Sequence, residues 1–197
     1  RLHLLAVSSI GSVEIVRRVK ARNVPITAGI CIWNLVFNDE CLRTFHPDYK
    51  VNPPLRSPKH IEACLDGLKD GTIDVISSGH SPRATEKKMQ EIDLAPFGMT
   101  MLETTLALVN THLIQPGILS WSEAITKLST SPARIMGLSK GTLHLGADAD
   151  VTVIDPHCQW RVEANNLRSR SANTPLLGTT LIGRATHVIV SGVVKLS

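Results

Sequence analysis

The stretch Leu2-His3-Leu4-Leu5-Ala6-Val7 is nearly all apolar and turns into Ser8-Ser9, after which Val13, Val16 and Val19 recur at helical spacing. A short apolar run followed by a 3.6-residue periodicity is typical of a buried strand that leads into an amphipathic helix. This opening therefore predicts an α/β unit.

Two further strands of the same kind follow. Residues 24–32 form a second extended apolar run, and residues 72–77 form a third. Between them, Ser57-Pro58 is a suitable cap and first position for a helix. Three strand–helix units are too few for a (β/α)8 barrel, which needs eight units and about 250 residues. Either the chain forms a smaller open sheet, or five units lie upstream.

The pattern changes in the second half of the chain. After Gly98 a long apolar helix is expected over residues 101–109, and Ser120 or Ser122 begins another that stops at Gly137. From Gly141 onward the apolar segments are short and β-type, at 149–154, 159–162 and 187–190, and are punctuated by glycine and proline. We therefore predict an α/β part over residues 1–140 and a small β domain over 141–197.

The composition excludes several classes of protein. The 197 residues are 43% hydrophobic, which supplies a core, and the formal charge of +4 is dispersed while only 4% of residues are aromatic, so nucleic-acid binding is not expected. The four cysteines show no CxxC spacing, which is typical of a reducing cytoplasm. The sequence contains no run of eighteen apolar residues, so it gives no indication of a membrane-spanning helix. The chain opens on a core-like strand without an initiator methionine, which we interpret as a fragment or a processed chain.

Four positions could carry ligand chemistry, and each has a simpler interpretation. Asn52 is held on a stiff loop before two prolines, yet it could merely satisfy a local turn. His80 follows a strand end, where barrel enzymes place functional side chains, but a single histidine there is more often a structural hydrogen-bonder. Arg83 could clamp a carboxylate or be solvated. Residues 95–98 could present backbone groups to a ligand because Gly98 permits close approach, or be only the entry turn of a helix.

The combination of motifs is more specific than any one of them. The motifs are Lys50-Val51-Asn52-Pro53-Pro54-Leu55-Arg56, Asp70-Gly71-Thr72-Ile73-Asp74, His80-x-Pro82, Ala95-Pro96-Phe97-Gly98, Ser131-Pro132-Ala133-Arg134, Gly146-Ala147-Asp148-Ala149-Asp150 and Asn173-Thr174-Pro175. Their order and spacing resemble the dihydroorotase family of the amidohydrolase superfamily over essentially the whole chain, in that family's C-terminal half. The asparagine in the first motif favours dihydroorotases over hydantoinases and allantoinases.

The resemblance implies an α/β fold, namely the C-terminal part of a (β/α)8 metal-dependent hydrolase barrel and part of a small β-sandwich domain. The strands near residues 2–7, 24–32 and 72–77 would be the sixth, seventh and eighth of the barrel. In that family zinc at the barrel mouth activates a hydroxide, and an aspartate at the end of the eighth strand shuttles the proton. The reaction interconverts carbamoyl aspartate and dihydroorotate in pyrimidine synthesis.

The positions that carry this chemistry differ here. By the resemblance a zinc-binding histidine is replaced by Ala6, the proton-shuttling aspartate by Gly79 and a carboxylate-binding histidine by Arg83. The family's Thr-Pro-His-His is replaced by Cys31-Ile32-Trp33-Asn34. The implied substrate-binding residues survive as Asn52 and the pair Phe97-Gly98, with Arg83 as a further candidate. We expect no catalytic residue, no metal ligand and no cofactor from this segment, since zinc sites need three or four N, O or S donors.

These substitutions favour a catalytically inactive dihydroorotase homologue, a pseudoenzyme with a structural or assembly role. Such homologues resemble the partner subunits of some aspartate transcarbamoylases, so that enzyme and the upstream half of the same barrel are the expected partners. Two alternatives stay open. One is an active metal-dependent cyclic amidohydrolase completed by the upstream half; the other is a module that binds a small carboxylated pyrimidine without turnover. In each case we expect a cytoplasmic location and no contact with nucleic acid or membrane.

Overall fold

The structure, a computed structural model, describes residues 1–196, which form two compact units. The first consists of residues 1–105 and 161–179, and the second of residues 106–160 and those from 180 onward. The boundary predicted between residues 140 and 141 marks a change in the sequence pattern, and it does not coincide with the division between these two units. The predicted domain boundary stays a prediction.

The elements of the first unit alternate between strands and helices. In chain order they are β1 (Leu2–Leu4), α1 (Ile10–Ala21), β2 (Ile26–Cys31), α2 (Trp33–Val36), the 3-10 helices Asp39–Thr44 and Pro47–Tyr49, α3 (Pro58–Lys69), β3 (Val75–Ser77), α4 (Thr85–Lys88) and the 3-10 helix Ala164–Asn166.

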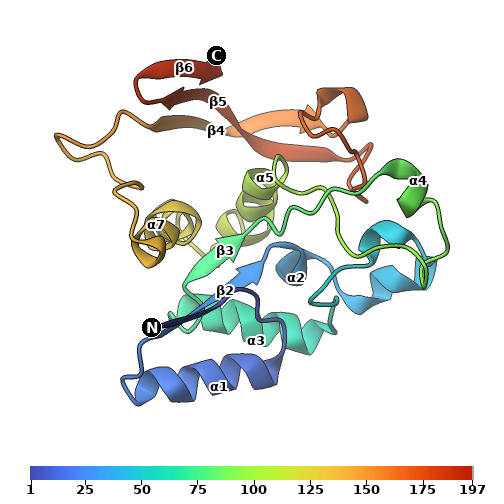
Figure 1. The fold of residues 1–197 in the computed structure, drawn as a ribbon, viewed down its shortest axis with the longest axis horizontal. Helices are drawn as coiled ribbons and strands as arrows, with labels where there is room; N and C mark the ends of the chain where they lie inside the picture. Colours follow the sequence, from blue (N-terminus) through green and yellow to red (C-terminus); the bar gives the residue numbers. More distant parts are fainter. Residues whose placement is uncertain (197) are drawn as a thin grey trace. The chain divides into compact units, whose positions relative to one another are not determined.

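The three strands of this unit form a parallel sheet in the order β1-β2-β3. Leu2 pairs with Ile26 across β1 and β2, and Cys31 pairs with Ser77 across β2 and β3. Helices α1 and α3 lie on one face of the sheet (Figure 1). The sheet is therefore parallel with helical crossovers, as the sequence predicts for α/β units.

The observed strands are shorter than the apolar runs that predicted them. The run over residues 72–77 contributes only β3, because Ile73 and Asp74 direct their backbone N–H groups to the carbonyl oxygens of Gly67 and Ala28. The Asp74 carboxylate accepts from the Ala28 N–H at 2.8 Å and pairs with Lys20 at 2.7 Å. Hydrophobicity predicted burial correctly here, while side-chain bonding decided where the strand begins.

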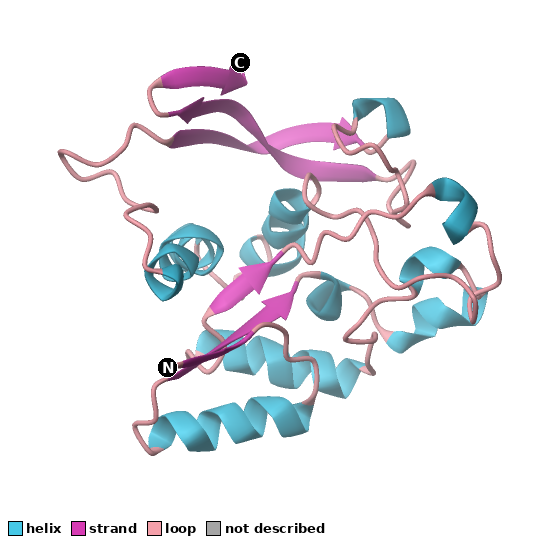
Figure 2. Ribbon diagram, viewed as in Figure 1, coloured by secondary structure: helices cyan, strands magenta, loops and turns pink. Residues whose placement is uncertain are grey.

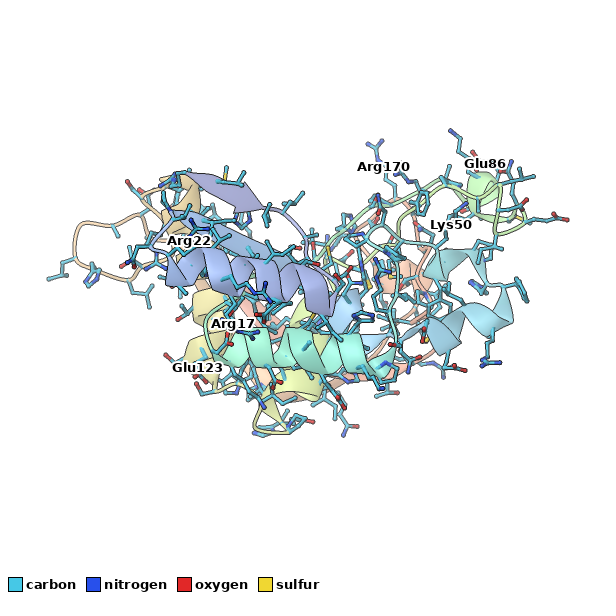
Figure 3. All side chains as sticks on the ribbon, turned by 90° about the horizontal axis from the view of Figure 1, so that it is seen from below. Arg17, Arg22, Lys50, Glu86, Glu123 and Arg170 are labelled. Carbon is cyan, nitrogen blue, oxygen red and sulfur yellow. The ribbon has the colours of Figure 1, made fainter. Side chains whose placement is uncertain are left out.

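Helices α1 and α3 pack side by side. The Ser9 hydroxyl caps α1 by accepting from the Ser12 N–H, which satisfies an otherwise unpaired donor. Figure 3 shows Arg17 between the two helices, where it donates to Asp70 at 2.7 Å and to Glu14 at 3.0 Å. Val13 and Val16, on the inner side of α1, are 1% and 0% exposed. The predicted helical spacing is confirmed, and this pairing fixes the helices that support the sheet.

The second unit combines short helices with an antiparallel sheet (Figure 2). Its elements are α5 (Thr105–Val109), the π-helices Asn110–Ile114 and Thr126–Thr130, α6 (Trp121–Ile125), α7 (Ser131–Met136), β4 (Val151–Arg161), β5 (Thr180–Val190) and β6 (Val193–Leu196). The first residue of α5 and the last of β4 lie in the first unit.

Several predictions for this region need correction. Helix α5 begins at Thr105 and not near residue 101, because the hydroxyls of Thr104 and Thr105 donate to the Met101 carbonyl in a turn before it. The two segments predicted at 149–154 and 159–162 are one continuous strand, β4. The helix stop at Gly137 is confirmed, with a left-handed φ of 71°, and so is the helix start at Ser120, which forms a capping box with Glu123.

Asn110 connects the helical part of this unit to its sheet. Its amide group donates to the carbonyl oxygens of Pro156 in β4 at 2.9 Å and of Ile182 in β5 at 3.1 Å. Pro156 lacks an N–H, and it is tolerated within β4 because β4 is an edge strand of the sheet, which has the order β4-β5-β6. Within residues 1–196 no helix is long and apolar enough to span a bilayer.

Candidate functional site

A cavity of about 470 Å³ opens in the first unit where the strands of the parallel sheet end. It lies beyond the last residues of β2 and β3 and beside the segment that follows β1, the edge at which parallel α/β sheets bind ligands. Its lining residues are Leu5, Ala6, Cys31, Trp33, Asn52, Ser77, Gly79, His80, Ser81, Arg83, Phe97 and Gly98.

The structure brings the four predicted binding residues to this one cavity, together with Ala6, Gly79 and His80. Ala6 and Gly79 line it at the strand ends, Asn52 lines it from the loop before α3, and Arg83, Phe97 and Gly98 line it from the segment after β3. These positions are up to 92 residues apart, so their meeting is a result of the fold. Their roles in binding a ligand stay predictions.

Trp33 fills the space beside Gly79. The Trp33 side chain is 3% exposed, and a Cβ placed on Gly79 would lie within 2.9 Å of three carbons of its ring. Real Cβ atoms essentially never approach another heavy atom within 3.0 Å. Gly79 also has a φ of 60°, a region that side chains disfavour. With Trp33 in place, residue 79 has no room for a side chain.

His80 is anchored by its ring. Its Nδ1 atom accepts hydrogen bonds from the backbone N–H groups of Met101 and Leu102, both at 3.2 Å. Because Nδ1 is an acceptor, the proton of the neutral ring resides on Nε2. His80 thus has a structural role in holding residues 101 and 102, and while the ring is neutral its second nitrogen can act only as a donor to the cavity.

The side chain of Arg83 is held at one end and free at the other. Its Nε donates to the Phe97 carbonyl at 2.7 Å, and within the described part of the chain no partner is found for its two terminal nitrogens. Arg83 is exposed and is the one charged residue among those lining the cavity. A guanidinium with both Nη groups available can bind a carboxylate through two parallel bonds.

Asn173 ties together the segments that carry these side chains. Its Oδ1 accepts from the Arg83 N–H at 2.9 Å and from the Thr100 hydroxyl at 3.0 Å, and its Nδ2 donates to the Gly98 carbonyl at 3.1 Å. Ser171 donates to the same Oδ1 and to the Arg83 carbonyl. Asn173 is 7% exposed. One buried amide therefore fixes the Arg83 loop against the Phe97-Gly98 turn.

The Phe97-Gly98 turn requires its glycine. Gly98 has a φ of 125°, and a Cβ there would lie within 2.7 Å of three atoms of Ser81. Its N–H donates to the Lys50 carbonyl at 2.9 Å, while the Lys50 ammonium lies 4.9 Å from the centre of the Phe97 ring. The motif around Asn52 is thus joined directly to the turn.

The residues at the strand ends do not fit a zinc ion. Within residues 1–196 no group of three or more His, Cys, Asp or Glu side chains is placed to hold a metal. Cys31 lines the cavity, but burial raises the pKa of its thiol and so disfavours the thiolate that binds zinc, while Ser77 Oγ lies 3.5 Å from its sulfur. The Nδ1 of His80 is already occupied. None of the twelve lining residues is acidic.

Reasoning from the sequence missed two of these residues. In the sequence Trp33 stands out only as a replacement within residues 31–34, although a bulky ring together with a glycine elsewhere is a signal of compensating volume. Asn173 stands out only as part of a motif. Its partners lie 73 to 90 residues away in the chain, and no spacing rule connects them.

Comparison with known proteins agrees with this architecture. The amidohydrolase family model matches residues 2–195. A protein of Rhodopirellula baltica named "Putative dihydroorotase" is 52% identical over 99% of this chain and 43% of its own length, and the dihydroorotase of Pelotomaculum thermopropionicum is 44% identical over 98% and 45%. The solved structure of the L-hydantoinase from Arthrobacter aurescens superposes with a TM-score of 0.93 at 27% identity, covering 100% of this chain and 45% of that one.

The chain therefore belongs to the amidohydrolase family, and its fold is the C-terminal part of the α/β architecture of that family. Within the family it is dihydroorotase-like. It spans less than half the length of the curated relatives that it matches.

Proposed function

We propose that this chain is part of a dihydroorotase-like protein of pyrimidine biosynthesis that does not catalyse the reaction and keeps its fold for a structural or assembly role in the cytoplasm. The observation that carries the proposal is the Trp33 ring packed beside Gly79. By the resemblance, residue 79 is where the family places its proton-shuttling aspartate.

The chemistry of the cavity supports the same conclusion. An acid–base group that is positioned at the reacting atoms contributes about 10²–10⁴ in rate. Here the lining has no carboxylate, residue 79 has no side chain and no space for one beside Trp33, and the Nδ1 atom of His80 already accepts two backbone N–H groups. A side chain lost by simple drift would leave a void, whereas this position has been filled.

The alternative function is an active metal-dependent cyclic amidohydrolase, with its metal ligands supplied by an upstream half. One observation favours it: the cavity is still open, with a volume of about 470 Å³, and Asn52, Arg83 and Phe97 all line it. A protein with only a structural role has no need of an open cavity. The two functions differ in turnover, which can be measured.

The test uses the full-length protein. We expect no conversion of dihydroorotate or of carbamoyl aspartate, with or without added zinc, under conditions in which the Pelotomaculum thermopropionicum dihydroorotase is assayed in parallel as a positive control. Zinc-dependent turnover would establish the alternative. The assembly role is tested by sedimentation of the full-length protein with aspartate transcarbamoylase of the same organism, where a co-sedimenting species is expected.

A further inference from the structure

The fold holds Arg83 rigidly and leaves its charged end without a partner. Its backbone N–H donates to Asn173 Oδ1 at 2.9 Å, and its carbonyl accepts from the Ser171 hydroxyl. Its Nε donates to the Phe97 carbonyl at 2.7 Å. Within residues 1–196 no carboxylate pairs with this guanidinium, and the cavity lining contains none. An arginine fixed at three points loses little conformational freedom on binding, so its two Nη groups are prepared for a carboxylate from outside the described chain.

The groups best placed to bind a partner lie at the rim of the cavity. Arg83 and Asn52 are exposed lining residues, and the Phe97 side chain in the same lining is 50% exposed. Arginine and aromatic residues are enriched among the few side chains that carry most of the binding energy in protein–protein interfaces. The rim therefore has the composition of an interface contact, with a single charge at its centre.

The less exposed lining residues offer few polar atoms to a small molecule. The Ser77 hydroxyl donates to the Ile30 carbonyl at 3.3 Å, and His80 Nδ1 accepts two backbone N–H groups. The Trp33 ring occupies the space beside Gly79. Sites for small molecules bury most of the ligand and direct several polar groups toward it. Here the polar groups are at the exposed rim instead, where the surface of another protein can reach them.

We propose that the rim at Arg83 is a contact through which this protein binds its assembly partner, with an aspartate or glutamate side chain of the partner paired to both Nη groups and packed beside the Phe97 ring. The inference rests on the assembly role proposed above and specifies the chemistry of the partner's surface. Arginine suits this contact because it stays charged and matches a carboxylate with two parallel bonds. The open cavity then has a use that requires no turnover.

Chemical labelling of arginine tests this contact without a mutation. Phenylglyoxal reacts with accessible guanidinium groups, and mass spectrometry of the digested protein reports each arginine separately. The full-length protein is labelled alone and in its complex with the aspartate transcarbamoylase of the same organism, isolated by sedimentation. We expect the labelling of Arg83 to fall at least about fivefold in the complex, because residues around such a contact exclude solvent from it.

Arg22 is the matched control within the same protein. It is exposed and directly follows α1, at the edge of the sheet where β2 begins, whereas the cavity lies where the strands end. Figure 3 shows Arg22 well apart from Lys50, whose ammonium lies 4.9 Å from the centre of the Phe97 ring. The labelling of Arg22 should therefore be the same in the free protein and in the complex.

Variants measure the strength of the contact. Arg83→Gln removes the charge and should raise the dissociation constant of the complex on the order of 30-fold or more, the usual effect of truncating one member of a desolvated charge pair. Arg83→Lys keeps the charge without the two parallel bonds and should give an intermediate value. Arg22→Gln should leave the dissociation constant unchanged. Thermal unfolding of each variant shows whether its fold is intact, and the labelling experiment stands if a variant does not fold.

The other outcomes overturn the inference in distinguishable ways. Equal labelling of Arg83 in the free protein and in the complex, or an Arg83→Gln variant that binds the partner with unchanged affinity, leaves the assembly role standing and removes this contact. Protection of Arg83 by millimolar dihydroorotate but not by the partner makes the cavity a small-molecule site. If the unmutated protein forms no complex, the assembly role itself fails and this inference fails with it.

Discussion

The contact between Trp33 and Gly79 predicts a strong energetic coupling between two residues 46 positions apart. The perturbation is a double-mutant cycle of Trp33→Ala and Gly79→Ala. A methyl group on Gly79 meets two separate penalties. The left-handed backbone costs about 1–2 kcal/mol for a residue with a Cβ, and forcing a carbon into the space occupied by the Trp33 ring costs about 1–3 kcal/mol more.

The two penalties predict different effects of Gly79→Ala in the unmutated protein and in the Trp33→Ala variant. Gly79→Ala alone should destabilise the full-length protein by about 2–5 kcal/mol, the sum of both. After Trp33→Ala, which itself costs about 3–5 kcal/mol through the cavity that it leaves, only the backbone penalty of about 1–2 kcal/mol should remain. The coupling is therefore about 1–3 kcal/mol, measured by denaturant unfolding. Trp33→Leu serves if the alanine variant does not fold.

Gly71 provides the matched control. Its φ of 79° is left-handed like that of Gly79, but a Cβ there would have no atom within 4 Å. Gly71→Ala should carry the backbone penalty alone and add to Trp33→Ala within about 0.5 kcal/mol, the usual scatter for independent sites. If Gly79→Ala is equally additive, the Trp33 ring does not restrict residue 79, and the main support for an inactive site is lost.

Three further predictions concern other parts of the first unit. Asn173→Ala should destabilise the protein by about 1–3 kcal/mol in denaturant unfolding, since it leaves the N–H of Arg83 without its acceptor and the Thr100 hydroxyl with the Ser171 carbonyl alone; a change near zero would show that the loops are held by other contacts. Arg83→Ala should weaken binding of carbamoyl aspartate or dihydroorotate by about 1.5–3 kcal/mol in calorimetry of the full-length protein, and an unchanged affinity would leave Arg83 as a solvated arginine. Burial raises the pKa of the Cys64 thiol to about 11 from its ordinary value of 9.0, so the buried thiol contributes stability that is complete below pH 9 and is lost as the pH rises from 9 toward 11. Unfolding midpoints across that range, compared with those of Cys64→Ala, should converge at the alkaline end, and a constant difference between them would contradict this assignment.

Local pattern predicted the framework of the fold but not its details. The valines of α1, the cap at Ser120 and the stop at Gly137 are local signals, and the structure confirms them. The start of β3 was predicted too early, because it depends on the Asp74 carboxylate bonding to Lys20 and to the Ala28 N–H in other elements. The strand β4 was predicted as two pieces, because Pro156 is a breaker by itself and is tolerated here only because β4 lies at the edge of its sheet.

The candidate site, like the fold, could be predicted only in part. Asn52, Gly79, Arg83 and Phe97-Gly98 were found because each belongs to a short motif, and the fold places them around one cavity. The sequence could not show that the space beside Gly79 is filled, because that depends on the rotamer of Trp33 and on the pairing of β2 with β3. Which of two residues distant in the sequence fills a given space depends on how the folded protein packs, and it can be determined only from the three-dimensional structure.

The tight packing of Trp33 on Gly79 also sets an order on the substitutions that produced this chain. If the ancestral residue at position 79 was the aspartate that the resemblance implies, a tryptophan at position 33 could not have been accepted first, since the ring and any side chain at 79 claim the same volume. The loss of the carboxylate therefore preceded the arrival of the indole or coincided with it. Once the indole was in place the reverse step at position 79 was closed, so a descendant of this lineage can regain the acid only by giving up the tryptophan first.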